Sequence, residues 1–361
     1  DADWSNSDNW NTVPPEEGDT LIFATAGAGG AATLLNNNLA SGRSYASLVF
    51  HSKATDAFTL AGNSITLTGD PDSQTIIVNH STLTQTVGMD VELGVDGKIN
   101  AAAGDIVVVG DISGDFSLTK TGDSTLTLSG SNSYTGGTII DAGAVVTGTL
   151  GTLGDAGGNL TLGGGSLDLG GTTQTVGAVS VTAEAGSGDT ISNGDLIGTS
   201  YAASNATGNA VILANLLANE SAGLTMSGTG TLTLSGSNNS YTGATNIDVG
   251  TLQVDGSLTG GGDVNINAGA TLQMNGLLTT GSLVAVPTDA TLNVGAGGNI
   301  QRDVTVSGGQ MNLAGTLAAG TTLNLTSGSI TTAAGPAKVA TADFSAGGTV
   351  NASANALAVT N

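Results

Sequence analysis

The sequence contains no cysteine and has few charged or aromatic residues. Among its 361 residues, 10% are Asp, Glu, Lys or Arg and 3% are Phe, Trp or Tyr. The absence of Cys excludes disulfide bonds, thiolate metal sites and a Cys nucleophile. No apolar run approaches the ~20 residues that a helix needs to cross a bilayer, so we expect no membrane span. A hydrophobic content of 39% nevertheless predicts a packed core.

Positive charge is scarce. Six Lys and Arg stand against 29 Asp and Glu, giving a net charge of −23, which opposes binding to nucleic acid, anionic lipid or acidic polysaccharide. The two histidines, His51 and His80, have no metal-ligand partner at a helical or turn spacing. No glycine-rich phosphate motif occurs. We therefore expect no cofactor, no metal site and no nucleic-acid partner.

Glycine is abundant, with 58 residues, and short apolar runs recur at a fixed period between the glycine-rich turns. One series is spaced 20, 20, 20, 19 and 19 residues apart: Leu232, Leu252, Leu272, Leu292, Met311 and Ile330. A second series advances with it at spacings of 19, 20, 20 and 19: Ile247, Ile266, Val286, Val306 and Leu325. Each period of about 20 residues thus contributes at least two strands at fixed positions.

Within each period, apolar and polar residues alternate, as in Leu252-Gln253-Val254. Period 2 is typical of a strand with one buried face. A constant period with short turns winds the chain always in one sense, which predicts an all-β fold: a right-handed parallel β-solenoid, or β-helix, with about 20 residues per coil. In this fold the outward amides are expected to stack as a ladder, each bonding the next coil. They are Gln253, Gln273, Asn293 and Asn312.

The regularity of the period suggests three segments. Residues 1–25 are predicted to form an N-terminal cap, residues 26–115 irregular solenoid coils, and residues 116–361 the regular solenoid. One run, Ala210–Glu220, has a spacing of large apolar residues that suits a helix, which would decorate one coil.

A longer duplication lies within the regular segment. Residues 118–146 and 224–254 repeat the same order of elements, and the second copy has one extra Asn, placed at Asn239. The residues that carry the duplication in the first copy are Gly122, Leu126, Leu128, Ser129, Gly130, Asn132, Tyr134, Thr135, Gly136 and Thr138. Those in the second are Gly228, Leu232, Leu234, Ser235, Gly236, Asn238, Tyr241, Thr242, Gly243 and Thr245. The two segments resemble the autotransporter-associated β-strand repeat of secreted passenger regions. The resemblance implies a secreted β-solenoid, a passenger or stalk element, with no catalytic residue attached to the motif.

The motif also has a physical interpretation. Leu126 and Leu128 are expected to point inward, and Asn132 to bond the backbone in an Asx-type turn. Gly130 and Gly136 are expected at corners, where glycine permits a sharp bend. Tyr134 and Tyr241 are expected to pack at a corner.

The first residues, Asp1-Ala2-Asp3-Trp4, include neither Met nor a basic or apolar leader. We interpret them as a mature terminus left by signal-peptide removal or as an artificial boundary of the segment, and expect the protein outside the cell or on the surface of a Gram-negative bacterium. Trp4 and Trp10, the two Trp residues, are predicted either to cap the first coil or to contact another subunit.

Three functions remain open. The first is a non-enzymatic structural protein that self-assembles end to end into a filament or surface coat, as a homopolymer through its solenoid ends. The uncharged run 344–352 and the lack of a translocator barrel after it favour this one. The second is an adhesin or stalk passenger of an autotransporter-like protein, with cell-surface or glycan contacts. The third is a β-helix enzyme acting on polysaccharide, which the lack of paired carboxylates disfavours.

Overall fold

The computed structural model describes residues 3–10, 13–24, 34–182, 188–204, 208–218, 221–279, 281, 283–318, 320–332, 337–339, 341–343, 349–352 and 357–359. Within these residues the single helical element is a 3₁₀ turn, η1 (Ser7–Asn9), and the rest is strand, turn and loop. The chain divides into two compact units, residues 1–177 and 178–361, and each is described by itself.

The first unit stacks parallel strands in three columns. Its first column contains β1 (Thr20–Phe23), β4 (Ser47–Phe50), β7 (Thr75–Asn79), β10 (Gly97–Ala101), β13 (Leu118–Thr121), β15 (Thr138–Ile140) and β17 (Leu160–Leu162). The second contains β2 (Leu34–Asn37), β5 (Thr59–Gly62), β8 (Gln85–Val87), β11 (Ile106–Val108), β14 (Thr125–Leu128), β16 (Gly143–Thr147) and β18 (Gly165–Thr175). The third contains β3 (Arg43–Tyr45), β6 (Ile65–Leu67), β9 (Val91–Leu93) and β12 (Ile112–Ser113).

The second unit is built the same way. Its first column contains β19 (Ala178–Val181), β21 (Ser200–Ala203), β24 (Leu224–Met226), β26 (Thr245–Ile247), β29 (Val264–Ile266) and β32 (Leu283–Pro287). The second contains β20 (Thr190–Gly198), β22 (Asn209–Ile212), β25 (Thr231–Leu234), β27 (Thr251–Val254), β30 (Thr271–Met274) and β33 (Thr291–Val294), with β23 (Asn215–Ala218) beside the end of β20.

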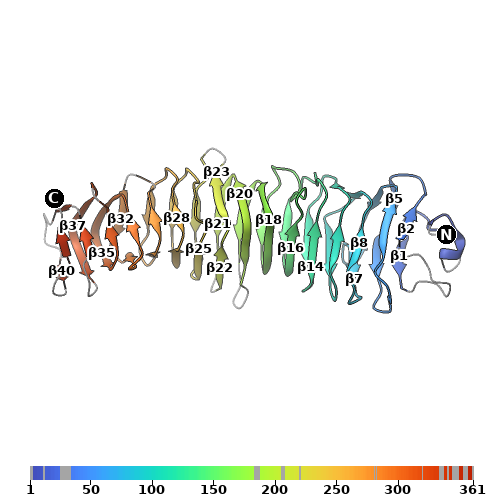
Figure 1. Cartoon of the computed structure of the whole chain (residues 1–361), viewed down its shortest axis with the longest axis horizontal. Helices are drawn as coiled ribbons and strands as arrows, with labels where there is room; N and C mark the ends of the chain where they lie inside the picture. The colour runs from blue at the N-terminus through green and yellow to red at the C-terminus, as the bar shows by residue number, and fades with distance from the viewer. Residues whose placement is uncertain are drawn as a thin grey trace. The chain divides into compact units, whose positions relative to one another are not determined.

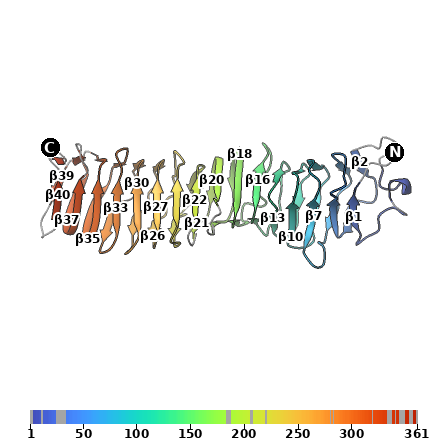
Figure 2. The ribbon, with the colours of Figure 1, turned by 90° about the horizontal axis from the view of Figure 1, so that it is seen from below.

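Two long strands, β35 (Asp303–Leu313) and β37 (Thr322–Thr332), run through both of these columns, and β39 (Thr341–Asp343) and β40 (Thr349–Ala352) follow them. The third column contains β28 (Ser257–Leu258), β31 (Leu277–Leu278), β34 (Asn299–Ile300), β36 (Thr316–Leu317), β38 (Ala337–Val339) and β41 (Leu357–Val359). Figures 1 and 2 show the strands of each unit following one another in chain order.

The strand registers confirm the parallel β-solenoid and the two apolar series. Leu232 pairs with Leu252, Leu252 with Leu272 and Leu272 with Leu292, and the series continues through Met311 to Ile330. All six side chains are buried, so each coil contributes one side chain to the same interior column. The second series pairs in the same way where Ile247 meets Ile266. Burial of these aliphatic columns opposes the chain entropy lost on folding.

Coil length differs along the first unit. From Leu21 to its partner Leu48 is 27 residues, and from Leu48 to Ile77 is 29. From Ile77 to Ile99 is 22 residues, and from Ile99 to Lys120 is 21. The later lengths agree with the predicted period, and the two early coils carry longer loops.

The prediction of a helix at residues 210–220 is wrong. Residues 209–212 form β22 and residues 215–218 form β23, while residues 219–220 lie outside the described part. Ala210, Ile212, Ala214 and Leu216 are all buried. Burial therefore alternates with period 2, and two of the inward positions are alanines, so that a pattern read from the large residues alone misses it.

Candidate functional site

Each duplicated segment contributes four strands to the first two columns of its unit, β13 to β16 in the first copy and β24 to β27 in the second. In the first copy Leu126 and Leu128 on β14 are fully buried, as predicted, and in the second copy Leu232 and Leu234 on β25 are buried in the same way. Leu126 pairs with Ile106 on the coil before and with Val145 on the coil after. The leucines therefore hold the repeat in register with both of its neighbours.

Asn132 joins three successive coils. Its side chain is 5% exposed. Its Oδ1 accepts from the Ile112 N–H at 2.9 Å, and its Nδ2 donates to the Thr152 carbonyl oxygen at 2.7 Å. Both partners are 20 residues away, so the prediction of a local Asx-type turn is wrong. The stacking of coils brings backbone groups of the coils before and after within reach, and the amide serves one of each.

The matching residue in the second copy is Asn239. Its Oδ1 accepts from the Leu216 N–H at 3.1 Å, and its Nδ2 donates to the carbonyl oxygens of Gly236 and Ser257, both at 3.0 Å. Asn239 is 1% exposed, whereas Asn238 is an exposed residue. The sequence alignment that equated Asn238 with Asn132 is therefore wrong. The inserted residue lies on the outside of the corner, and the buried amide keeps its place.

The tyrosines of the two copies are buried at a corner, as predicted. The Tyr134 hydroxyl lies 2.7 Å from the Thr138 Oγ1, and the Tyr241 hydroxyl lies 2.8 Å from the Thr245 Oγ1. Burial raises the pKa of both phenols well above the ordinary value, and the threonine hydrogen bond only partly offsets this. These phenols are structural groups that stay neutral, not acids or bases.

The repeat glycines are required by close approach between coils. Gly130 and Gly136 have φ values outside the left-handed region. A Cβ at Gly130 would overlap the Gly110 carbonyl oxygen, and one at Gly136 would overlap the backbone of Phe116 and Ser117. Their predicted place at corners therefore has a different physical reason, since the missing side chain matters more than the bend.

Sequence reasoning missed Lys120, a buried cation on β13. The side chain is 1% exposed, and its Nζ donates to the carbonyl oxygens of Gly122 at 2.6 Å, Thr121 at 3.0 Å and Ala142 at 3.1 Å. Burial lowers the pKa of Lys120 to about 8, against the opposing charges of Asp123 and Asp105. Its place in the alternating run Leu118-Thr119-Lys120 was the available signal, because period 2 puts position 120 on the same side as Leu118.

The two Trp residues lie together at the start of the first unit. The Trp4 ring is 1% exposed and meets the rings of Trp10 at 5.8 Å, Tyr45 at 6.0 Å and Phe23 at 6.2 Å between centroids. The Trp10 Nε1 donates to the Trp4 carbonyl oxygen at 2.9 Å, and the Trp4 N–H donates to the Asn36 carbonyl oxygen at 2.9 Å. The segment 3–10 is thereby fixed against β2. A cap or an inter-subunit contact through these residues stays a prediction.

The outward amides of the second unit form the predicted column, but only part of the predicted ladder. Gln253, Gln273, Asn293 and Asn312 are partners in the strand register. The Asn312 Nδ2 donates to the Asn293 Oδ1 at 2.7 Å, which confirms the ladder between these two coils.

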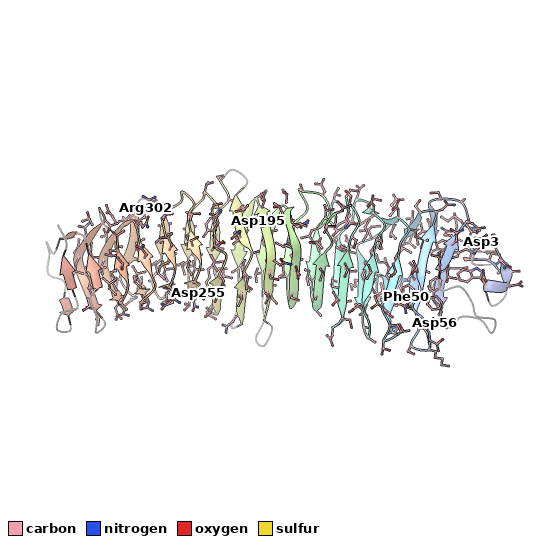
Figure 3. The ribbon with its side chains drawn as sticks, viewed as in Figure 1. Asp3, Phe50, Asp56, Asp195, Asp255 and Arg302 are labelled. Carbon is pink, nitrogen blue, oxygen red and sulfur yellow. The ribbon has the colours of Figure 1, made fainter. Side chains whose placement is uncertain are left out.

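At the two glutamines the inter-coil bond is absent from the contacts of the described residues, and the prediction is wrong there. The Gln253 Nε2 donates to both carboxylate oxygens of Asp255, and the Gln273 Nε2 donates to the Asn275 Oδ1. Both acceptors stand two residues later, directly after the end of the strand. Asp255, which is labelled in Figure 3, is exposed and also accepts from the Asn275 Nδ2 at 2.8 Å.

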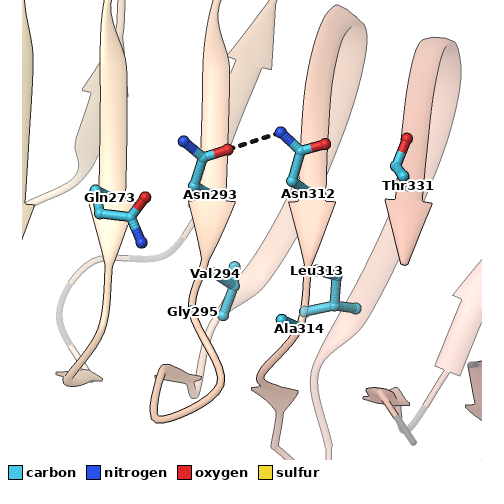
Figure 4. A pocket seen from close by; sticks show the side chains of 8 residues that line it. All are labelled: Gln273, Asn293, Val294, Gly295, Asn312, Leu313, Ala314 and Thr331. Atoms are coloured by element: carbon cyan, nitrogen blue, oxygen red, sulfur yellow. Dashed lines mark hydrogen bonds between the residues drawn. The ribbon is translucent and has the colours of Figure 1, made fainter. Parts of the chain in front are cut away.

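A groove lies beside this column, over β30, β33, β35 and β37. Its volume is about 310 Å³, at the lower end of the ~300–1,000 Å³ range of ligand sites. Eight residues line it: Gln273, Asn293, Val294, Gly295, Asn312, Leu313, Ala314 and Thr331. Figure 4 shows the four polar side chains in one row, with the apolar residues at the strand ends beneath them. No ionisable residue belongs to this lining.

The two histidines have different surroundings. The His51 Nδ1 accepts from the Lys53 N–H at 3.1 Å. His80 borders a hollow of about 260 Å³ with Asp70 and Ser73 on the outside of the first unit. Among the residues that the structure describes, no group of three His, Cys, Asp or Glu side chains is placed to hold a metal ion. In the same residues no helix has the length and hydropathy to cross a membrane.

Comparison with protein families matches the two duplicated segments. Residues 118–146 and 224–254 match the family described as passenger-associated-transport-repeat. We refer to these two matched segments as the transport repeats. Their setting in a parallel β-solenoid supports an autotransporter passenger-type repeat protein, which confirms the resemblance seen in the sequence. Searches of curated proteins and of solved structures gave no match.

Buried polar side chains of the transport repeats bond within the coils. In the first transport repeat, the buried side chains of Lys120, Asn132, Tyr134 and Thr138 form hydrogen bonds within the coils. In the second, Asn239 and Tyr241 do the same. The motif therefore serves the stacking of coils, and any binding surface must lie on outward-facing residues such as those of the groove.

Proposed function

We propose that this chain is a non-enzymatic passenger segment, an extracellular β-solenoid that serves as a stalk on the surface of a Gram-negative bacterium. The observation that carries the proposal is the interior column from Leu232 to Ile330, to which each coil contributes one buried residue. Each added coil extends such a stack by ~4.8 Å and adds no catalytic group. The repeating sequence therefore encodes the length of each unit and not a cleft.

Surface labelling of intact cells that make the natural protein tests the location. An antibody raised against the full chain is expected to label intact cells, and external protease is expected to remove the signal. Labelling that appears only after the cells are permeabilised would contradict the proposal. Release of reducing ends from polysaccharides by the purified chain would contradict its non-enzymatic part and favour the β-helix enzyme.

End-to-end assembly into a filament is the competing proposal, since solenoid ends carry unpaired backbone groups. At the start of the first unit, Trp4 and the segment 3–10 pack against β2 and the ring of Phe23, and we expect this segment to cover the first coil and to oppose stacking there. The other end includes residues 344–348 and 353–356, which lie outside the described part.

Sedimentation and negative-stain microscopy over a range of concentrations separate the two proposals. Single particles at all concentrations are expected for a stalk. Fibres that lengthen with concentration would favour the filament. A variant with Trp4→Ala, which removes this packing, is expected to associate more than the wild type if the segment caps the first coil.

A further inference from the structure

The groove of the second unit has hydrogen-bonding capacity that the fold does not use. The Asn312 Nδ2 is engaged with the Asn293 Oδ1, so the Asn312 Oδ1 and the Asn293 Nδ2 have no partner among the described contacts. The Gln273 Nε2 is held by Asn275, and its Oε1 is left over. The row thus offers at least one free acceptor at Gln273, one donor at Asn293 and one acceptor at Asn312. The Thr331 hydroxyl can both donate and accept.

A hydroxyl-bearing ligand matches this row. Each sugar hydroxyl donates one hydrogen bond and accepts others, so adjacent hydroxyls can meet an amide oxygen and an amide N–H at once. The row lies on successive coils, which repeat along one direction at ~4.8 Å. A linear polysaccharide likewise repeats its hydroxyls along one direction. Of the apolar residues beside the row, Val294 and Leu313 are buried and Ala314 is exposed, so the Ala314 methyl group is the apolar contact offered to the C–H face of a sugar ring.

Charge limits the class of glycan. The lining contains no Lys, Arg, His, Asp or Glu, and the chain as a whole carries −23. A uronic-acid or sulfated polysaccharide would bring negative charge to a negative protein with no cation to receive it. A neutral sugar meets no such cost.

We propose that this groove binds a neutral, linear polysaccharide, with Gln273, Asn293, Asn312 and Thr331 contacting its hydroxyls along the stacked coils. The role of such binding in the cell rests on the proposed surface location. The binding itself does not, because it can be measured with the purified chain. The lining has no aromatic platform, so single-site affinity is expected in the millimolar range, and a polymer gains by occupying several neighbouring coils.

Binding is tested with the full chain and three neutral hexasaccharides, namely cellohexaose, mannohexaose and laminarihexaose, against hexagalacturonate as the acidic probe. Saturation-transfer NMR and titration calorimetry are the measurements. At least one neutral probe is expected to bind, and the acidic probe is expected to bind at least tenfold more weakly. The double variant Asn293→Ala/Asn312→Ala is expected to weaken the neutral probe about tenfold or more.

Asn265→Ala provides a matched control. Asn265 on β29 is exposed and donates to the Asn246 Oδ1 at 2.8 Å, so its replacement removes a similar amide pair away from the groove. Unchanged binding in this variant, with circular dichroism confirming the fold of all variants, supports the groove. No binding of any neutral probe at ten millimolar, equal loss in the control, or tighter binding of hexagalacturonate would overturn the proposal. None of these outcomes affects the surface-labelling test of the stalk.

Discussion

Lys120 and Met226 occupy the same position of the two transport repeats, and both are buried. Lys120 pairs with Ile140 on the next coil, as Met226 pairs with Ile247. The Lys120 ammonium donates to three backbone carbonyl oxygens, whereas a thioether needs no such partners. The second repeat thus shows which neutral side chain the first can accept, and it suggests a direct substitution.

Lys120→Met is expected to stabilise the protein at pH 7 by roughly 1–3 kcal/mol, because it removes a buried charge. The pKa of Lys120 is about 8 in the folded state and ordinary, 10.5, in the unfolded state. Between these values the unfolded chain holds a proton that the folded chain has released, so stability of the wild type rises with pH from about 8 to 10.5. Denaturant titration at pH 7 and 9.5 checks both statements, and the variant should lack this part of the rise.

Lys98→Met is the control for this substitution, since Lys98 on β10 is half-buried. A similar change in both variants would show that the effect comes from net charge and not from burial of the Lys120 ammonium.

Alkaline pH is expected to destabilise the fold above about pH 10 through its tyrosines. Burial raises the pKa of Tyr134, Tyr201 and Tyr241, and also that of Tyr45, above the ordinary 10.0. In the unfolded chain these phenols lose protons near pH 10 while the folded chain retains them, so stability falls as the pH rises further. Absorbance of tyrosinate should appear together with the loss of the strand signal in circular dichroism. Tyrosinate formed in a protein that stays folded would contradict this.

Asn239→Ala is expected to cost about 2–3 kcal/mol, because it leaves the buried Leu216 N–H without its acceptor and removes one of the two hydrogen bonds to each of the Gly236 and Ser257 carbonyl oxygens. The neighbouring Asn238→Ala should change stability by less than ~0.5 kcal/mol, since that side chain is exposed. Denaturant titration measures the difference, and hydrogen exchange should quicken at the Leu216 amide in the first variant alone. Equal effects would restore the alignment of Asn238 with Asn132.

Gly130→Ala is expected to destabilise the first unit by about 1–3 kcal/mol, since the new Cβ must displace the backbone of the preceding coil. At Gly261 a Cβ meets nothing within 4 Å and φ is not in the left-handed region. Gly261→Ala should therefore be neutral or slightly stabilising. Thermal unfolding of the two variants side by side decides the point, and a loss of the same size in both would mean that coil spacing is not what Gly130 protects.

The winding of the chain could be predicted from the sequence because its evidence is the period itself. Leu252, Leu272 and Leu292 can share a column only if each coil returns to the same place. Side-chain partners were less accessible, because they depend on what stands two residues along the strand. Gln253 has Asp255 there and Gln273 has Asn275, and each glutamine donates to that neighbour on its own coil. Asn293 and Asn312 are followed at that position by Gly295 and Ala314, so they reach across to each other instead.

The tertiary role of Asn132 was beyond the sequence for a related reason. Its partners Ile112 and Thr152 are defined by the stack and not by nearby residues. The alternation at Ala210 and Ala214 was readable, and counting alanine as a core residue would have found it. The groove could not be predicted, because its walls come from four strands and its shape depends on how the chain turns after β33 and β35.

The corner between Gly236 and Asn239 accommodates one more residue than its counterpart in the first transport repeat, while the anchoring amide and the leucines keep their contacts. Length can thus vary at this point without a shift of the strands on either side. A foreign epitope grafted between Ser237 and Asn238 would accordingly be carried outside the coils, which makes this corner the natural place to tag or decorate the protein.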